Sequence, residues 1–425
     1  MSQNDLVTSH FNMDAHAVLD PAIVAQNTHV DLTAEPNAVF LTGVTGFVGA
    51  YLCRDILQKT GADVYCLVRA ESRQNAFARI KSNLERYSLW QPEYAQRLIP
   101  VKGDLKLPLF GLTPDTFQML ADWIDVIYHC GSKLSYVAPF EYLNAANIGG
   151  TQEALRLATR GKAKPLHYVS TLGIFLAYKI PQGGQEDDEL DPTKCPDVGY
   201  FRTKYVAEKV VRIARDRGIP VTIHRIGLIV GDSQTGLSNV DDFVARMLIG
   251  SIEAGYAPDV RTAMDMTPVD FASAAIYYLS RQKASVGQTF HILNPEPIHW
   301  SDIFDIVIEA GYPVRKLPFE EWVGAIEKHA DPATNPLYPL LPFFHIDFAR
   351  RMLGVSESHF HALGRAVTQQ ALAGFGVRCP HIDKNLIGTF LSRMAQSGRL
   401  ASPSGENISH SLDDHESAAI SRATG

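Results

Sequence analysis

Two tyrosine–lysine pairs with a spacing of four residues stand in one segment of the chain. They are Tyr200 with Lys204 and Tyr205 with Lys209. Positions four apart share a face of a helix, so each pair could bring a phenol and an ammonium together. Such a phenol could protonate the alkoxide that forms when a hydride reaches a carbonyl, and the ammonium would lower its pKa from about 10. The chain has 16 tyrosines, so the spacing alone is weak evidence for a catalytic pair. The position of each pair in the expected fold must distinguish between them.

A hydroxyl side chain precedes these pairs at the end of an expected strand. The strand closes with His167-Tyr168-Val169-Ser170-Thr171. Open parallel sheets bind ligands at the carboxyl ends of their strands, where the hydroxyl of Thr171 could meet a substrate carbonyl. Ser170 is a rival for this role, because neighbouring strand residues face opposite sides of the sheet.

The first tyrosine–lysine pair has the better position. Tyr200 opens its helix directly after a glycine, at the end nearer the same sheet edge. Tyr205 is rotated by about 140° around the helix, and we assign its pair to ordinary helix positions. The sequence therefore predicts that Thr171, Tyr200 and Lys204 are the catalytic set.

A glycine-rich loop follows the first expected strand. It reads Thr42-Gly43-Val44-Thr45-Gly46-Phe47-Val48-Gly49. Gly43 permits a tight turn, Gly46 lets the backbone approach a pyrophosphate, and Gly49 lets helix and strand pack closely. The helix that follows would present free N–H groups and its positive dipole end to the phosphates. We predict that a dinucleotide binds here, at Thr42, Gly43, Thr45, Gly46, Phe47, Val48 and Gly49.

The residue at the end of the second strand distinguishes between cofactors. A domain that prefers NAD would place Asp or Glu here, on the ribose 2′-hydroxyl, but this strand ends on Arg69. A guanidinium matches a 2′-phosphate through paired charge-assisted hydrogen bonds, and Arg73 and Arg79 on the next helix could reinforce it. The sequence therefore predicts NADPH as the cofactor. Asp104 and Leu105, after the third strand, are candidates for contact with the adenine edge.

Short apolar runs that alternate with helix-length segments must position these residues. The expected strands are residues 39–41, 64–68, 98–101, 126–128, 166–169 and 221–223, and the expected helices include 47–57, 72–87, 142–158 and 200–217. The alternation predicts an α/β fold of the Rossmann type, with a doubly wound parallel sheet and helices on both faces. A smaller, mainly helical substrate domain is expected to follow it.

We divide the chain into four parts. Residues 1–37 are predicted to be a leader that packs loosely on the domain behind it. Residues 38–290 form the NADP-binding domain, with interleaved substrate-domain segments near 173–198 and 232–264. Residues 291–395 form the helical substrate-binding domain, and residues 396–425 are predicted to be a disordered tail because they lack periodicity.

Composition narrows the class of protein. The 425 residues are 46% hydrophobic and carry a net charge of −7, which favours a globular enzyme and gives no basic excess for nucleic acid. The polar N-terminus does not resemble a signal peptide, and no apolar run is long enough to span a bilayer. The five cysteines lack a Cys-x-x-Cys pair, so we expect a cytoplasmic protein without a disulfide framework. The acidic run 186–189 is interpreted as a solvated loop, and no metal is predicted. A monomer is favoured.

In this order, the motifs resemble those of an extended short-chain dehydrogenase/reductase, and more specifically the thioester reductase family. This family comprises the terminal reductase domains of non-ribosomal peptide synthetases, carboxylic acid reductases and α-aminoadipate reductases. The resemblance runs from about Asp14 to Met394. Its most specific segments are 231–236 (GDSQTG) and 265–270 (DMTPVD). The other segments are 17–21 (AVLDP), 40–49 (FLTGVTGFVG), 66–69 (CLVR), 128–131 (YHCG), 147–151 (NIGGT) and 199–204 (GYFRTK).

The resemblance implies a reductase that delivers a hydride from NADPH to an acyl thioester, held on the phosphopantetheine arm of a carrier protein or on coenzyme A. An aldehyde is released, and some members reduce it further to an alcohol. Thr171 and Tyr200 would hold and protonate the oxyanion, while Lys204 would orient the nicotinamide ribose. The predicted cofactor site also includes Gly131, Ser132, Lys133, Tyr200 and Lys204.

The chain departs from this family at three positions. Ile226 replaces the proline of the usual Arg-Pro-Gly, Ser135 replaces an asparagine, and Lys133 places a charge near the cofactor cleft. The sequence contains neither an adenylation region nor a carrier-type Gly-Gly-Asp-Ser segment. We therefore expect it to act on a thioester that is made elsewhere. Trp300, Trp322, Tyr338 and Phe343 could line the acyl pocket or simply form the core of the helical unit.

Three alternative functions remain open. A fatty acyl-CoA reductase is the nearest. A sugar-nucleotide epimerase or dehydratase with NAD would favour an acidic residue at position 69, where this chain has arginine. A catalytically silent module that senses NADP is the third, and the intact catalytic set argues against it.

Overall fold

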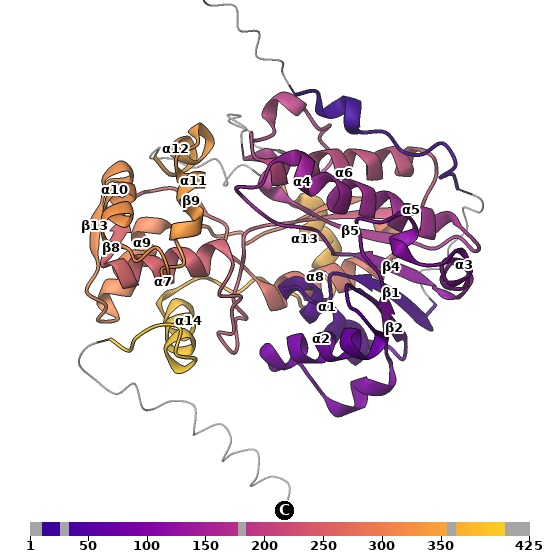
Figure 1. Cartoon of the computed structure of the whole chain (residues 1–425), viewed down its shortest axis with the longest axis horizontal. Coiled ribbons are helices and arrows are strands. Elements are labelled where there is room, and N and C mark those ends of the chain that lie inside the picture. Colours follow the sequence, from indigo (N-terminus) through magenta and orange to yellow (C-terminus); the bar gives the residue numbers. More distant parts are fainter. Residues whose placement is uncertain (1–10, 26–33, 177–183, 355–362, 404–425) are drawn as a thin grey trace, which may run out of the picture.

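The computed structural model describes residues 11–25, 34–176, 184–354 and 363–403 (Figure 1). Most of the predicted disordered tail, the first ten residues and part of the predicted segment 173–198 lie outside the described residues.

A seven-stranded parallel sheet forms the centre of the protein, in the order β11-β6-β5-β4-β1-β2-β3. The predicted Rossmann-type fold is confirmed. Six of the strands correspond to the predicted runs: β1 (Ala38–Thr42), β2 (Asp63–Val68), β3 (Leu98–Lys102), β4 (Val126–His129), β5 (Leu166–Thr171) and β6 (Val221–Ile226). The sequence did not reveal the seventh strand, β11 (Thr289–Ile292), because only two of its four residues are apolar.

Helices cover both faces of this sheet (Figure 1). On one face, α1 (Phe47–Lys59), α2 (Arg73–Arg86) and α8 (Val269–Ser280) share an apolar core with the strands. On the other face lie α3 (Pro114–Trp123), α5 (Gly150–Thr159) and α6 (Gly199–Asp216). The predicted helix 142–158 is composite, because α4 (Phe140–Asn144) continues through one π-helical turn, Ala145–Gly149, into α5.

A second apolar core gathers the helices at the C-terminal side of the chain. It includes α7 (Phe243–Ala254), α9 (Trp300–Glu309), α10 (Phe319–His329), α11 (Leu341–Phe344), α12 (Asp347–Gly354) and α14 (Lys384–Gln396). Three short strand pairs complete the structure: β7 (Ile229–Val230) with β10 (Thr267–Pro268), β8 (Tyr256–Pro258) with β13 (Arg315–Leu317), and β9 (Ala263–Met264) with β12 (Ile298–His299). The helix α13 (Ala366–Leu372) packs instead beside α8 and β11. The domain boundaries themselves stay a prediction.

The described part of the leader is packed more firmly than the sequence predicted. Leu19 and Ile23 are buried in the core of the sheet domain. The Arg217 guanidinium donates hydrogen bonds to the carbonyl oxygens of Leu19, Asp20 and Ile23, at 2.7 to 3.0 Å. The carboxylate of Asp20 also pairs with Arg156 at 2.9 Å. The prediction of loose packing is therefore wrong for residues 11–25, because polar contacts add to the apolar ones.

The described part of the predicted tail, residues 396–403, includes a packed side chain. Leu400 is buried in the second core, and its N–H donates to the carbonyl of Met394 at 3.2 Å. Across the described ranges, no helix is both long and apolar enough to cross a membrane.

Candidate active site

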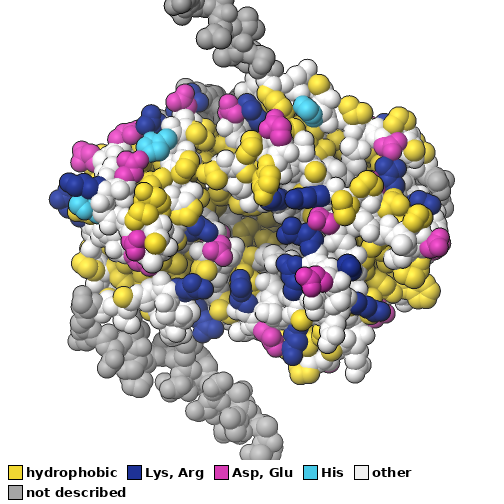
Figure 2. Space-filling view, viewed as in Figure 1, with side chains coloured by type: hydrophobic (Ala, Val, Ile, Leu, Met, Phe, Trp, Pro, Cys, Tyr) yellow, Lys and Arg dark blue, Asp and Glu magenta, His cyan; other side chains and the backbone are white. Residues whose placement is uncertain are grey.

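A cleft of about 650 Å³ opens at the carboxyl ends of the central strands. β1 pairs with β2 on one side and β4 on the other, so the strand order reverses between β1 and β4 at this edge. Figure 2 shows the hollow, with Lys and Arg side chains along its rim and apolar groups deeper inside. With the exception of Arg73, the residues predicted to act in catalysis or cofactor binding line it: Thr42, Gly43, Thr45, Gly46, Phe47, Val48, Gly49, Arg69, Arg79, Asp104, Leu105, Gly131, Ser132, Lys133, Thr171, Tyr200 and Lys204.

The glycine loop has the geometry that a dinucleotide requires. Gly43 has φ = +86°, and a Cβ there would stand 2.7 Å from the backbone nitrogen of Gly131. A Cβ at Gly49 would collide with the Gly43 carbonyl oxygen, so helix and strand meet only because both residues are glycine. α1 begins at Phe47 without a side-chain cap, which leaves its first N–H groups free for an anion. The loop and helix end fit a pyrophosphate.

Asn83 on α2 supports this loop and was missed by the sequence reasoning. Its side-chain amide donates to the carbonyl oxygens of Val44 and Gly46, at 2.9 and 3.1 Å. No local pattern could have revealed it, because the contact crosses from the second helix to the first loop.

Two arginines line the cleft near the end of β2, one directly after the strand and one on α2. Arg69 and Arg79 are exposed, and Arg79 donates a hydrogen bond to the Arg69 carbonyl. That bond fixes the backbone from which Arg69 projects. Arg73, the third predicted arginine, is also exposed but is not among the residues that line the cleft.

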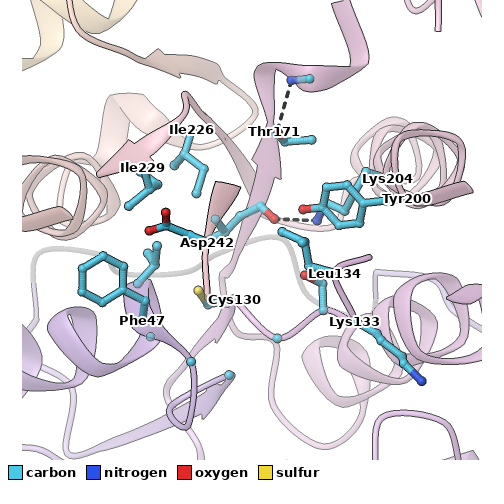
Figure 3. Close-up of a pocket in the computed structure, with 18 of the residues that line it drawn as sticks. Phe47, Cys130, Lys133, Leu134, Thr171, Tyr200, Lys204, Ile226, Ile229 and Asp242 are labelled. Atoms are coloured by element: carbon cyan, nitrogen blue, oxygen red, sulfur yellow. Dashed lines mark hydrogen bonds between the residues drawn. The ribbon is translucent and has the colours of Figure 1, made fainter. Parts of the chain in front are cut away.

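The loop after β4 is held in place, but the ammonium of Lys133 points away from Tyr200 and Lys204 (Figure 3). The Asn147 side chain accepts from the Lys133 N–H at 2.6 Å and donates to its carbonyl at 3.0 Å. The ammonium lies 3.4 Å from the ring centroid of Tyr142. The charge that distinguishes this chain at position 133 thus belongs to the rim of the cleft. Ser135, another departure, accepts a hydrogen bond from the Ala138 N–H at 3.1 Å.

Thr171, Tyr200 and Lys204 come together in the cleft (Figure 3). The Thr171 hydroxyl accepts a hydrogen bond from the Gly173 N–H at 3.0 Å, which leaves its proton free to point at a ligand. Tyr200 and Lys204 project from the first turns of α6. The Lys204 ammonium donates to the carbonyl of Val169 at 2.7 Å and lies 4.2 Å from the centroid of the Tyr168 ring.

Burial is the largest influence on the pKa values of Tyr200 and Lys204. It raises the pKa of Tyr200 to about 12, and a hydrogen bond with Ser132 only partly offsets the rise. Burial also lowers the pKa of Lys204 to about 8. The net lowering of the Tyr200 pKa that the spacing predicted is not found in this structure, because burial outweighs any contribution from the Lys204 ammonium.

Ser170 and Thr171 have separate environments. Ser170 donates to the buried carboxylate of Glu208 on α6 at 2.7 Å. Glu208 in turn pairs with the buried guanidinium of Arg225 at 2.6 Å. The rival hydroxyl is therefore engaged in a buried polar network, whereas Thr171 ends the strand at the cleft.

The second tyrosine–lysine pair makes structural contacts. The Tyr205 hydroxyl donates to the Leu190 carbonyl at 3.0 Å, and Lys209 pairs with Asp14 in the leader at 2.5 Å.

The most specific sequence segments hold each other beside the cleft. The Ser233 N–H and hydroxyl donate to the Asp270 carboxylate at 3.0 and 2.6 Å, which joins the loop 231–236 to the start of α8. Asp265 accepts from the Leu228 N–H at 3.0 Å. A Cβ at Gly227 would collide with an Asp265 carboxylate oxygen, so the motif requires glycine there.

The sequence did not single out several residues of the cleft as site residues. Figure 3 labels Cys130, Ile229 and Asp242 among them, and it shows Ile226, the departure from proline, on the same side as Ile229. Asp242 caps α7 by accepting from the Ala245 N–H at 2.8 Å, and burial raises its pKa to about 7. An aspartate before an apolar helix signals a cap, and nothing in that pattern indicates a cleft.

The acidic run after residue 185 also has a structural partner. The Glu186 carboxylate accepts from the N–H groups of Val367 and Thr368 at the start of α13, at 2.8 and 2.9 Å. The residues that the structure describes include no cluster of three or more His, Cys, Asp or Glu arranged for a metal ion.

The four aromatic residues proposed for the acyl pocket do not all reach the cleft. Phe343 lines the cleft. Trp300 and Trp322 are fully buried in the second core, and Tyr338 is not among the lining residues.

Comparisons with known proteins agree with this architecture. The family described as "Male sterility protein", a family of NAD-binding domains, matches residues 41–276. A linear gramicidin synthase polypeptide of Brevibacillus parabrevis is 38% identical over 387 residues, which are 90% of this chain and 8% of that protein. Glycine betaine reductase ATRR of Emericella nidulans is 42% identical over 318 residues, 72% of this chain and 25% of that protein. The chain thus spans a quarter or less of these two relatives.

Solved structures give the same picture over full-length domains. The terminal R domain from the myxalamid PKS-NRPS biosynthetic pathway has a TM-score of 0.85 and 40% identity, covering 92% of this chain and 98% of that one. The reductase (R) domain of a nonribosomal peptide synthetase from Mycobacterium tuberculosis has a TM-score of 0.72 and 26% identity, covering 91% and 96%.

Proposed function

The chain belongs to the family of NAD-binding reductase domains that includes the terminal R domains of nonribosomal peptide synthetases, and on this premise we propose that it reduces an acyl thioester to an aldehyde with NADPH. Its family makes it an oxidoreductase with a nicotinamide cofactor. The thioester substrate, the choice of NADPH over NADH and the individual residue roles are our proposal.

One observation carries the proposal. The phosphate loop, the hydroxyl of Thr171 and the phenol of Tyr200 line a single cleft, although they come from β1, β5 and α6. A carbonyl bound between Thr171 and Tyr200 would meet two hydroxyl donors beside the end of the sheet where a dinucleotide binds.

The side chains would divide the work as follows. NADPH, when bound, supplies the hydride that reaches the carbonyl carbon. Tyr200 gives its phenolic proton to the carbonyl oxygen, and Thr171 donates a hydrogen bond to the same oxygen, so a hemithioacetal forms. Lys204, charged below its pKa of about 8, stabilises the phenolate left on Tyr200. That phenolate takes the hydroxyl proton back as the carbon–sulfur bond breaks, and the departing thiolate is protonated from solvent.

The proposal of NADPH over NADH rests on two arginines at the rim of the cleft. Arg69, directly after β2, and Arg79, on α2, line the cleft where the ribose 2′ position of a dinucleotide is expected. A 2′-phosphate would accept charge-assisted hydrogen bonds from both guanidiniums, which favours NADPH. The acyl donor is carried by the phosphopantetheine arm of a carrier protein or by coenzyme A.

The test is NADPH consumption with a panel of acyl-CoA and acyl-pantetheine thioesters, with the products identified by mass spectrometry. Tyr200→Phe should lower turnover by about 10²- to 10⁴-fold while NADPH affinity is kept, because only the transferred proton is lost. Tyr205→Phe is the matched control: its hydroxyl bonds to the Leu190 carbonyl, and turnover should persist. Thioesters that are never reduced, or a Tyr200→Phe variant as active as the parent, would reject the proposal.

A further inference from the structure

Five aromatic side chains that line the cleft form a closed circuit of ring contacts. The Tyr200 ring centroid lies 6.3 Å from that of Tyr136 and 5.6 Å from that of Phe201. Phe343 lies 5.3 Å from Tyr136. Phe348 closes the circuit at 6.0 Å from Phe201 and 6.2 Å from Phe343. We call these five side chains the aromatic wall.

The aromatic wall belongs to the second apolar core and brings elements of the sheet domain against the C-terminal helices at the reacting group. Tyr136 comes from the loop after β4 and Phe201 from α6, whereas Phe343 and Phe348 come from α11 and α12. Tyr200 is itself part of the wall. A carbonyl that meets the Tyr200 hydroxyl therefore places the rest of its acyl group against rings, and Leu176 and Met352 extend the same lining.

Each charged side chain of the described lining that lies away from the rim already has a partner within the protein. The carboxylate of Asp265 accepts from the Leu228 N–H, Asp242 caps α7, and Asp241 pairs with Arg246 at 3.2 Å. Among the cations, Lys204 donates to Val169. The remaining charged residues of the lining belong to the rim and the dinucleotide end: Arg69, Arg79, Asp104, Lys106 and Lys133.

The arrangement of the rings also argues against a quaternary ammonium group. An aromatic cage for such a cation presents separated ring faces around a central space. Here Tyr136 and Phe201 contact each other across the circuit, with centroids 6.1 Å apart at an interplanar angle of 61°. The rings therefore pack into one continuous apolar surface.

From these contacts we infer that the substrate is a thioester with an extended, uncharged apolar acyl chain, which runs from Tyr200 along the aromatic wall towards α11 and α12. The inference rests on the proposed thioester reduction and names the substrate class of that site. Each methylene that the wall takes out of water should strengthen binding by about fourfold.

The test measures binding without turnover. S-alkyl-CoA thioethers from ethyl to octyl, which carry no carbonyl to reduce, are titrated by calorimetry into the full chain with saturating NADP⁺. We expect the affinity to rise about fourfold per methylene until the wall is covered. A flat series, or tighter binding of a thioether with a trimethylammonium head than of its uncharged isostere, would overturn the inference.

Two variants separate the wall from general packing. Phe348→Ala removes a wall ring that is 7% exposed, and Phe319→Ala removes a 6% exposed ring of the same core that does not line the cleft. The chain-length dependence should weaken in the first variant and persist in the second. An equal loss of chain-length dependence in both variants would contradict binding at the aromatic wall. If a variant does not fold, the thioether series with the parent protein tests the inference alone.

The two proposals fail in different ways. A steep thioether series without reduction of any thioester would reject the function and leave the apolar wall standing. Reduction of thioesters with a kcat/KM that does not depend on acyl chain length would reject binding of the acyl chain at the aromatic wall, and the proposed thioester reduction would remain supported.

Discussion

Glu208 and Arg225 form an ion pair from which water is excluded, and breaking it should be costly. Both side chains have no exposed surface, and two nitrogens of Arg225 donate to one Glu208 oxygen at 2.6 and 3.1 Å. Burial alone would raise the pKa of Glu208, yet the guanidiniums of Arg225 and Arg212 lower it to about 2. Glu208→Ala would leave the Arg225 guanidinium buried without its carboxylate. We expect the free energy of unfolding to fall by about 3 to 5 kcal/mol.

Urea unfolding followed by circular dichroism measures this loss. The matched control is Glu208→Leu combined with Arg225→Met, which removes both charges and keeps apolar volume. Its stability should exceed that of Glu208→Ala, because the buried Arg225 charge is removed together with its partner, although Arg212 still loses its contact with Glu208. A single variant that loses less than about 1 kcal/mol, or a double variant as unstable as the single one, would refute the reasoning.

Two further predictions concern the cofactor and pH. Arg69→Ala should weaken the binding of NADPH by about 1 to 3 kcal/mol and that of NADH much less, as measured by fluorescence titration. Arg73→Ala is the control, because Arg73 is exposed and does not line the cleft. Equal losses of affinity for the two cofactors would contradict a contact between Arg69 and the 2′-phosphate. Burial lowers the pKa of His129 and His224 to about 3, so between pH 6.5 and 3 the unfolded chain binds protons that the folded chain does not. Each histidine should then remove up to about 1.4 kcal/mol of stability per pH unit as the pH falls, and His224→Leu should flatten the urea-measured profile by one such contribution; an unchanged slope would show that His224 titrates normally.

The elements of the sheet that position the cofactor were predictable because their signals are local. β1 and β2 are apolar runs, and the loop from Gly43 to Gly49 carries its own steric requirement. Once the strand order is known, the ends of β1, β2, β4 and β5 must meet at one edge, so residues as far apart as Thr42 and Thr171 reach the same cleft. The strand β11 was not predicted, because its burial depends on residues distant in the sequence. One of them is Thr368, whose hydroxyl accepts a hydrogen bond from the His291 N–H at 2.9 Å.

The parts of the site that were missed depend on contacts between distant segments. Tyr136 and Phe348 are ordinary aromatic residues in the sequence, and only the packing of the start of α6 against both the loop after β4 and α12 brings them to the cleft. The pKa of Tyr200 was predicted in the wrong direction for the same reason. Sequence spacing indicated a neighbouring ammonium, but it carried no information on how deeply the phenol is buried or where the ammonium of Lys204 is directed.

The helix α6 links Tyr200 and Lys204 to the buried polar network around Glu208. Tyr200, Lys204 and Glu208 follow each other at four-residue steps, and each step advances only about 40° beyond a full turn. All three side chains therefore face the end of β5, where Lys204 meets the Val169 carbonyl and Glu208 meets Ser170. Because Arg225 on β6 and Ser170 on β5 both bind Glu208, the rotation of α6 against the sheet is fixed one turn beyond Lys204. Ser170 also lines the cleft, but its hydroxyl binds Glu208 and so anchors the helix that carries Tyr200, while the hydroxyl of the next residue, Thr171, is the one proposed to meet the substrate.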